Sequence, residues 1–357
     1  MDYMNHRGLG RAWDAPLSVD GHAVHDHRAP QRAECGDSNR TVASRLDVSV
    51  VICMYTEDRW EAIVQAVSSV RQQTLAPREI ILVVDHNPEL LARVQREIPD
   101  VVIVANAEAR GLSGGRNTGI AVSHGAIVAF LDDDAAAEPT WLEHMSASFD
   151  DLRVLGGGSF VAPRWMGKRP QWLPEEFYWV VGCSHRGLPR QTAEVRNPFG
   201  GSMWLRREVF DEIGGFANGI GRERGRPMGC EETELAIRAR QRWPDRTFVL
   251  EPRARVHHRV TPERMRWAYF RSRCYAEGLS KAAVSRLVGT KDALSAERSY
   301  TYRTLPLGML RGVTDVIVNR DTLGLARAGA IGSGLAFTVA GYLVGTVNAR
   351  LAARRAD

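Results

Sequence analysis

The sequence Ala126-Ile-Val-Ala-Phe-Leu-Asp-Asp-Asp-Ala135 joins an apolar run of strand length to three consecutive aspartates. Adjacent carboxylates repel one another, and at the mouth of a buried strand they cost stability unless a cation lies beside them. Mg²⁺ and Mn²⁺ prefer oxygen ligands, and open α/β sheets bind ligands at the carboxyl ends of their strands. The run therefore favours a metal and diphosphate site at Asp132, Asp133 and Asp134. An acidic surface loop is the alternative that these residues alone leave open.

Strand and helix patterns alternate upstream of this run. Residues 48–53, 79–84 and 101–104 have the apolar, β-branched character of buried strands, and residues 88–97 have the pattern of a helix. This alternation predicts an α/β fold with a mostly parallel sheet flanked by helices. No G-x-G-x-x-G follows the first strand and no P-loop motif occurs, so a dehydrogenase of that fingerprint and a P-loop phosphotransferase are poorly supported.

The composition of the 357-residue chain is that of a soluble globular protein with one large domain or two smaller ones. Its net charge of +5 comes mostly from arginine, which fits anionic partners such as diphosphates or lipid headgroups. The chain has no lysine-rich run and no zinc-finger spacing, so we expect no nucleic-acid partner. Five cysteines without a C-x-x-C predict a reducing compartment, and hence a cytoplasmic protein.

Two further polar residues are candidates for the same site. Asp85 ends the second strand, where it could accept hydrogen bonds from a base or a ribose, or cap the next helix. Arg116 lies in the glycine-rich residues 109–119, just inside a helix expected over residues 117–124. Its guanidinium could reach a diphosphate or neutralise the aspartates.

Four motifs follow one another in a fixed order. They are Tyr55-Thr-Glu57, Val84-Asp-His-Asn87, Gly111-Leu-Ser-Gly-Gly-Arg-Asn-Thr-Gly119, and Phe130-Leu-Asp-Asp-Asp134 with Glu138-Pro-Thr-Trp141. Together they resemble the family-two glycosyltransferases, over roughly residues 48–258. The resemblance implies the Rossmann-like GT-A fold and an enzyme that takes a sugar from a nucleotide-diphosphate donor.

The resemblance also implies roles for individual residues. Donor binding would fall to Thr56, Glu57, Asp85, Arg116, Asp132 and Asp133. A divalent metal, Mg²⁺ or Mn²⁺, would be bound by Asp132, Asp134 and His258. His258 is preferred to His257 because neighbouring residues of an extended segment point to opposite faces.

Residues 228–235 resemble the family's G-x-E-D-x-E-L segment, with Glu232 in place of the usual aspartate. In inverting transferases a carboxylate here is the general base for the acceptor hydroxyl. We expect Glu232 to hold this role, with Glu231 second; a solvated acidic helix start is the alternative. The predicted function is inverting glycosyl transfer to a hydroxyl-bearing saccharide or lipid-linked acceptor, in cell-envelope polysaccharide or glycolipid synthesis. A nucleotidyltransferase and a non-catalytic, membrane-tethered sugar-nucleotide binder are the alternatives.

The sequence divides into three expected regions. Residues 1–46 have little apolar periodicity and predict a disordered tail, residues 47–260 the catalytic domain, and residues 261–357 a helical C-terminal region. Residues 262–275 mix arginine with aromatic residues, and residues 328–347 carry no charge over about 30 Å of helix. Both segments predict contact with the inner face of the cell membrane, or else packing on the catalytic domain. Gly341 and Gly345 form a G-x-x-x-G, which permits close helix packing.

Overall fold

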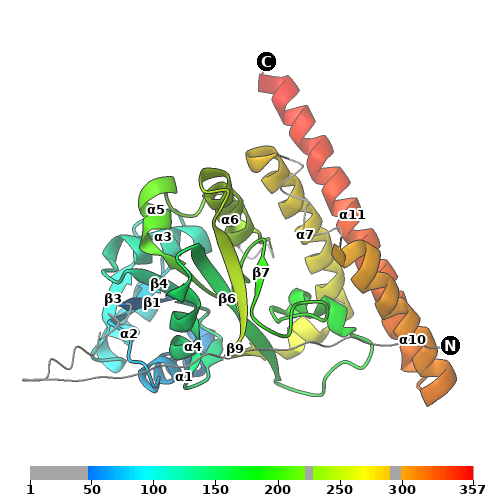
Figure 1. Ribbon diagram of the computed structural model, residues 1–357, viewed down its shortest axis with the longest axis horizontal. Coiled ribbons are helices and arrows are strands. Elements are labelled where there is room, and N and C mark those ends of the chain that lie inside the picture. The colour runs from blue at the N-terminus through cyan, green and yellow to red at the C-terminus, as the bar shows by residue number, and fades with distance from the viewer. Residues whose placement is uncertain (1–46, 222–227, 290–298, 357) are drawn as a thin grey trace, which may run out of the picture. The chain divides into compact units, whose positions relative to one another are not determined.

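The computed structural model describes residues 47–221, 228–289 and 299–356. The predicted tail over residues 1–46 lies outside the described residues. The predicted α/β fold class is confirmed: helices flank a central sheet, and further helices follow it at the C-terminal end (Figure 1).

The first half of the sheet is parallel. Strands β3, β2, β1 and β4 lie side by side in that order, and all three pairings are parallel. Helices α1, α2 and α3 connect them, as the alternating pattern predicts. The bounds are β1 (Val48–Met54), α1 (Trp60–Arg71), β2 (Glu79–Val84), α2 (Pro88–Glu97), β3 (Val102–Ala105), α3 (Leu112–Val122) and β4 (Ile127–Leu131). Since α3 begins at Leu112, Arg116 lies in its second turn, inside the helix rather than at its start.

The second half of the sheet is mixed. Beyond β4 the order is β8, β6, β9 and β5, with β7 paired to β9. Of these pairings only the long one between β6 and β9 is parallel. The bounds are β5 (Ala135–Ala137), β6 (Val154–Trp165), β7 (Ala193–Val195), β8 (Ser202–Arg206) and β9 (Thr247–Val260).

Apolar side chains alternate between the two faces of the sheet and create a core on each. Val50 and Ile52 of β1 pack with α1, α2 and α4 (Trp141–Ala147). Val51, between them, packs in the other core, to which α5 (Arg207–Ile213) and α6 (Glu231–Arg242) contribute. Short 3-10 turns occur on the connecting segments: η1 (Glu57–Arg59), η2 (Ser148–Asp150), η3 (Glu175–Val181) and η4 (Pro262–Met265).

The C-terminal region is helical, as predicted. It consists of α7 (Trp267–Val288), the π-helical turn η5 (Tyr300–Thr304), α10 (Leu305–Asn319) and α11 (Leu323–Ala356). In Figure 1, α10 (orange) and α11 (red) form a hairpin, and α11 continues along α7. The two glycines of the G-x-x-x-G lie at the contact between α11 and α7. A Cβ on Gly341 would lie 2.0 Å from the Tyr275 carbonyl oxygen, and one on Gly345 would lie 2.8 Å from Ala282 Cβ, so the two helices approach closely there.

Candidate active site

The aspartate triplet lies in the tight turn between β4 and β5. The Ala135 N–H donates to the Asp132 carbonyl, and the Asp132 N–H donates to the Gly201 carbonyl at 3.2 Å. Asp133 and Asp134 are buried, whereas Asp132 is half-buried. Because β4 is flanked by β1 on one side and β8 on the other, the triplet stands at the carboxyl end of the parallel half of the sheet.

Two arginines that the sequence interpretation did not assign to the site neutralise this turn. Arg59 Nη1 lies 2.6 Å from Asp133 Oδ1 and 3.2 Å from Asp134 Oδ2. Arg264 Nη2 donates to Asp134 Oδ2 at 3.1 Å. Of the two alternatives for residues 262–275, Arg264 follows the second, packing on the catalytic domain, because the short turn η4 points this side chain inward before α7 begins.

Burial and ion pairing act in opposite directions on the two buried aspartates. Burial raises the pKa of Asp133 to about 7, against the attraction of Arg59. Burial also opposes ionisation of Asp134, but His258 and Arg264 outweigh it and hold the pKa of that carboxyl well below its usual range. Asp134 is therefore the carboxylate that stays ionised at neutral pH.

His258 reaches the triplet because β9 pairs with β5, with His258 directly opposite Ala135. Its Nε2 lies 3.1 Å from Asp134 Oδ1, whereas His257 faces away and contacts Glu138. One ligand atom each from Asp132, Asp134 and His258 lie within 4.8 Å of one another. The two carboxylates suit Mn²⁺ or Mg²⁺, and the buried Oδ2 of Asp133 has no hydrogen-bond partner among the described residues. The donor set therefore fits a hard divalent cation.

Arg116 connects the triplet to α6. Its Nη1 donates to Glu231 Oε1 at 2.8 Å and its Nη2 to the Gly200 carbonyl at 2.7 Å, while Asp132 Oδ1 lies 3.8 Å away. The closest ionic partner of Arg116 is thus Glu231, not the triplet. A buried Glu231 held by this guanidinium is poorly placed to take a proton from a substrate.

Glu232 is half-buried, and its Oε1 accepts a hydrogen bond from the Thr233 hydroxyl at 3.5 Å. Burial, together with the neighbouring charge of Glu231, raises the pKa of Glu232 to about 8. Cys230, the residue before α6, has φ of 73°, a left-handed conformation that turns the chain sharply into the helix.

The Gly200–Gly201 turn brings the two carboxylate groups together. A Cβ on Gly200 would lie 3.4 Å from Glu232 Oε2, and a Cβ on Gly201 would lie 3.3 Å from Asp132 Oδ2. Because Gly200 and Gly201 are adjacent, Glu232 and Asp132 of the triplet lie beside the same short turn.

The predicted nucleoside residues lie on the neighbouring loops after β1 and β2. Asp85 accepts hydrogen bonds from Asn106 Nδ2 at 2.7 Å and from the Gly111 N–H at 3.0 Å, so it also holds the loop that begins α3. The Thr56 hydroxyl accepts from the Asp58 N–H and caps η1. Thr56 and Glu57 are half-buried, and Arg59 on the same turn reaches the triplet. The two loops are joined by a hydrogen bond from Asn87 to the Tyr55 carbonyl.

Comparison of the sequence with known proteins identifies the family to which this chain belongs. Residues 49–214 match the family described as glycosyl transferase family 2. The chain is also 37% identical over 248 residues to the glucosyl-dolichyl phosphate glucuronosyltransferase of Haloferax volcanii, and the match covers 68% of this chain and 78% of that protein. The chain belongs to glycosyltransferase family 2. The predicted family and the predicted class of enzyme, one that transfers sugars, are both confirmed.

Other members and neighbours agree with this placement. Glycosyltransferase AglE of Haloferax volcanii is 35% identical over 180 residues, which cover 48% of this family-two chain and 56% of AglE. Among solved structures, the mannosyltransferase PcManGT from Pyrobaculum calidifontis, in complex with GDP-Man and Mn²⁺, superposes with a TM-score of 0.51. That match has 17% sequence identity and covers 83% of this chain and 87% of the mannosyltransferase, so it shows a shared fold.

Within this family-two enzyme, the sequence could locate the carboxylates and His258 but not their arginine partners. The motifs are local runs, so they are visible without knowing the fold. Arg59 and Arg264 meet the triplet only through contacts that span 74 and 130 residues. The only available signal was the requirement for a cation beside three carboxylates, which does not say which arginine supplies it.

Proposed function

We propose that this enzyme transfers a sugar, with inversion and divalent-metal assistance, from a nucleotide-diphosphate donor to a hydroxyl of a lipid-linked saccharide. The setting would be cell-envelope glycan synthesis at the cytoplasmic face of the membrane. The observation that carries the proposal is the meeting of Glu232 and the aspartate triplet at the Gly200–Gly201 turn.

The donor end of the site would be built on the triplet. Asp132, Asp134 and His258 would hold Mg²⁺ or Mn²⁺, with Asp133 beside the donor. When bound, the metal would act as a Lewis acid and stabilise the departing diphosphate. Thr56, Glu57 and Asp85 would contact the nucleoside. Arg116 would hold Glu231 in position through their ion pair, and its remaining contact with Asp132 would add positive charge near the diphosphate.

Glu232 would act at the acceptor end. Its carboxylate takes the proton of the acceptor hydroxyl as that oxygen forms a bond to the anomeric carbon. The bond between the anomeric carbon and the diphosphate oxygen breaks on the opposite face, and nucleoside diphosphate leaves with the bonding electron pair. A raised pKa strengthens Glu232 as a base once it is ionised.

The class of acceptor is supported by a relative. The Haloferax volcanii enzyme is named for glucosyl-dolichyl phosphate, a sugar carried on a lipid phosphate. The match covers most of both chains, which favours an acceptor of the same general kind here. The sugar and nucleobase of the donor are left to experiment.

The test is release of nucleoside diphosphate from a panel of nucleotide sugars, with Mn²⁺ or Mg²⁺ and then with chelator. We expect metal-dependent release from one donor, and loss of both release and donor binding in Asp134→Ala. Glu232→Gln should bind that donor with a dissociation constant within about threefold of wild type and lose transfer by at least about a hundredfold, because only the proton-transfer step is removed. Asp211→Asn, at an exposed carboxylate on α5, is the matched control and should behave as wild type.

The outcomes separate the alternatives. Release of pyrophosphate instead of nucleoside diphosphate would indicate a nucleotidyltransferase. Tight donor binding that is unchanged in Glu232→Gln, with no transfer to any lipid-linked saccharide, would favour a sugar-nucleotide binder. No metal-dependent binding of any nucleotide sugar would overturn the proposed donor site.

A further inference from the structure

The hairpin of α10 and α11 exposes an unusual amount of apolar surface. Ile317 of α10 and Leu343 of α11 are 74% and 58% exposed, against nearly zero for core residues. The exposed apolar side chains recur at helical spacing, and we call the set Leu310, Val313, Ile317, Val339, Leu343 and Val347 the hairpin surface. Apolar patches of this extent on a soluble chain mark a contact with another molecule or with lipid.

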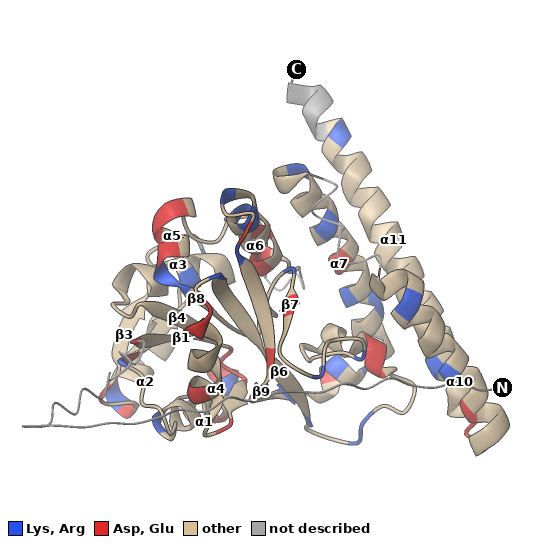
Figure 2. Ribbon diagram, in the orientation of Figure 1, with Lys and Arg blue, Asp and Glu red and all other residues tan. Residues whose placement is uncertain are grey.

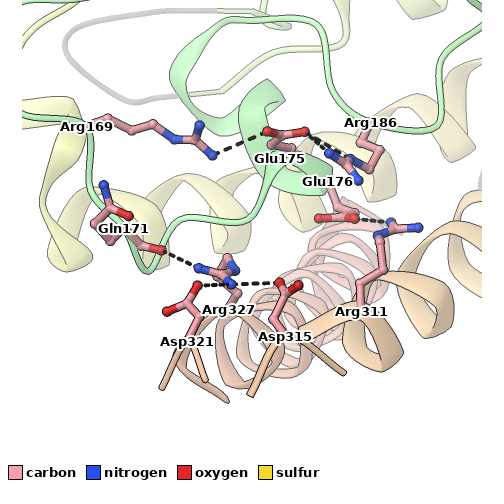
Figure 3. Close-up of polar contacts among 9 residues, drawn as sticks. All are labelled: Arg169, Gln171, Glu175, Glu176, Arg186, Arg311, Asp315, Asp321 and Arg327. Carbon is pink, nitrogen blue, oxygen red and sulfur yellow. Dashed lines mark hydrogen bonds and ion pairs between the residues drawn. The ribbon is translucent and has the colours of Figure 1, made fainter. Parts of the chain in front are cut away.

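The charges of the hairpin point to an anionic partner. Its two described acidic residues are used internally: Asp315 and Asp321 accept from Arg327 at 2.8 Å and 2.7 Å (Figure 3). Among the side chains that the structure describes, the hairpin's remaining exposed charges are Arg320 and Arg350, and Arg303 is exposed on η5 just before α10. Figure 2 shows α11 as a mostly tan helix between its arginines. An apolar surface edged by arginine complements the boundary between acyl chains and anionic headgroups.

The packing of α11 argues against a transmembrane helix. Among the described residues, Leu323–Leu351 is the segment long and apolar enough to cross a bilayer, with a mean hydropathy of 1.5. The middle of this segment lies against α7, since a Cβ on Gly278 would be 2.0 Å from the Thr338 carbonyl oxygen. The adjoining α7 residue Glu277 forms ion pairs with Arg273 and Lys281. A spanning α11 would carry these charges into the hydrocarbon layer at high cost.

We propose that the α10–α11 hairpin lies in the plane of an anionic bilayer, with the hairpin surface in the headgroup and acyl boundary, and that neither helix crosses the membrane. The inference adds a membrane-binding element to the proposed transferase and does not rest on its sugar chemistry.

An ion pair and a hydrogen bond fix the hairpin to the catalytic part of the chain. Arg311 of α10 pairs with the buried Glu176 of η3, and Arg327 of α11 donates to the Gln171 carbonyl at 3.4 Å (Figure 3). The neighbouring Glu175 pairs with Arg169 and Arg186. A hairpin held in this way sets the orientation of the catalytic part above the lipid, which suits an acceptor whose saccharide projects from the bilayer.

Flotation with vesicles tests the surface. The full chain should bind vesicles of phosphatidylglycerol and phosphatidylethanolamine, and bind pure phosphatidylcholine less well. The double variant Leu310→Glu with Ile317→Glu should lower the bound fraction at least about tenfold, and Leu343→Glu with Val347→Glu should do the same. Each pair removes apolar area that the bilayer would bury and adds negative charge. Leu152→Glu, at a leucine outside the hairpin that is 79% exposed, is the matched control and should bind as wild type. Thermal unfolding within about 3 °C of wild type would show that the variants fold.

Topology is tested in sealed inside-out membrane vesicles from cells that express the full chain with Cys35 and Cys53 changed to serine. Thr322→Cys and Asn348→Cys lie at the two ends of the apolar part of α11, about 39 Å apart along the helix. An in-plane hairpin leaves both open to an impermeant maleimide from outside. Labelling of one cysteine only after detergent is added would show a spanning helix and overturn the proposal.

Failure of vesicle binding would also overturn it. If the free protein then proves to be a dimer that Leu310→Glu with Ile317→Glu dissociates, a second copy covers the hairpin surface instead. Nucleoside diphosphate release by these variants from the nucleotide-sugar donor, measured with a water-soluble acceptor, should stay at the wild-type rate, so the membrane inference and the proposed chemistry can fail separately.

Discussion

At the scale of single residues, Glu232 should set the pH dependence of transfer. Its pKa is raised to about 8, so only a minor fraction is ionised below that pH. If the carboxylate is the base, kcat/KM should rise about tenfold per pH unit up to pH about 8 and level off above it. Initial rates from pH 6 to 9.5 check this. Glu232→Asp should keep a rising profile at a lower rate, and a rising profile retained in Glu232→Gln would assign the slope to another group.

Glu232 should also make the stability of the folded protein depend on pH. An unfolded glutamate loses its proton near pH 4.5, whereas folded Glu232 keeps its proton to about pH 8. Folding therefore takes up a proton between these values, and the wild type loses stability as the pH rises through this range. Glu232→Gln cannot lose this proton. The Tm of wild type minus that of Glu232→Gln should fall between pH 5 and pH 9, and a constant difference would show that the carboxyl is not buried.

At the scale of elements, the sequence predicted the regular units well and the irregular ones poorly. The bounds of β2 and α2 match the pattern because apolar spacing is a local signal, although the residue that caps α2 is Asn87 and not Asp85. The break at η4 is not local. Thr261 and Pro262 are typical of a helix start, yet the chain makes one short turn and restarts at Trp267. That break is stabilised by the contacts of Arg264 with Asp134 and His258, which no sequence period encodes.

The η4 turn gives a prediction about the metal. Arg264→Ala leaves the buried Asp134 with less neutralising charge, which should cost about 3–5 kcal/mol in the metal-free protein. Mn²⁺ should then raise the Tm of Arg264→Ala more than that of wild type, because the metal supplies the missing charge and no longer meets a competing guanidinium. Calorimetry with and without Mn²⁺ measures both effects. Arg266→Ala, at an exposed arginine two residues on, should change neither. Equal Mn²⁺ shifts in all three proteins would place the metal elsewhere.

At the scale of the whole described molecule, α7 joins the catalytic residues to the C-terminal hairpin. On one side, the Gly229 N–H donates to Ser280 Oγ, and Cys230 Sγ contacts Glu277 just before α6. On the other side, Gly278 packs directly on Gly341 of α11. A change in the packing of α11 on α7 should therefore shift the start of α6, where Glu232 lies.

Alanine substitutions at two glycines of α11 test the packing of α11 on α7, because they should change the free energy of unfolding in opposite directions. A Cβ added at Gly341 would lie 2.0 Å from a backbone oxygen of α7, whereas a Cβ added at Gly329 would have no atom within 4 Å. Gly341→Ala should cost about 1–3 kcal/mol by overpacking, and Gly329→Ala should add about 0.5–1 kcal/mol through helix propensity. Gly278→Ala should resemble Gly341→Ala, and the double variant should cost less than the sum because both act at one contact. Urea unfolding of the four variants measures each free energy. A stabilising Gly341→Ala would show that α11 is not held against α7 in solution, and would remove the structural reason for an in-plane hairpin.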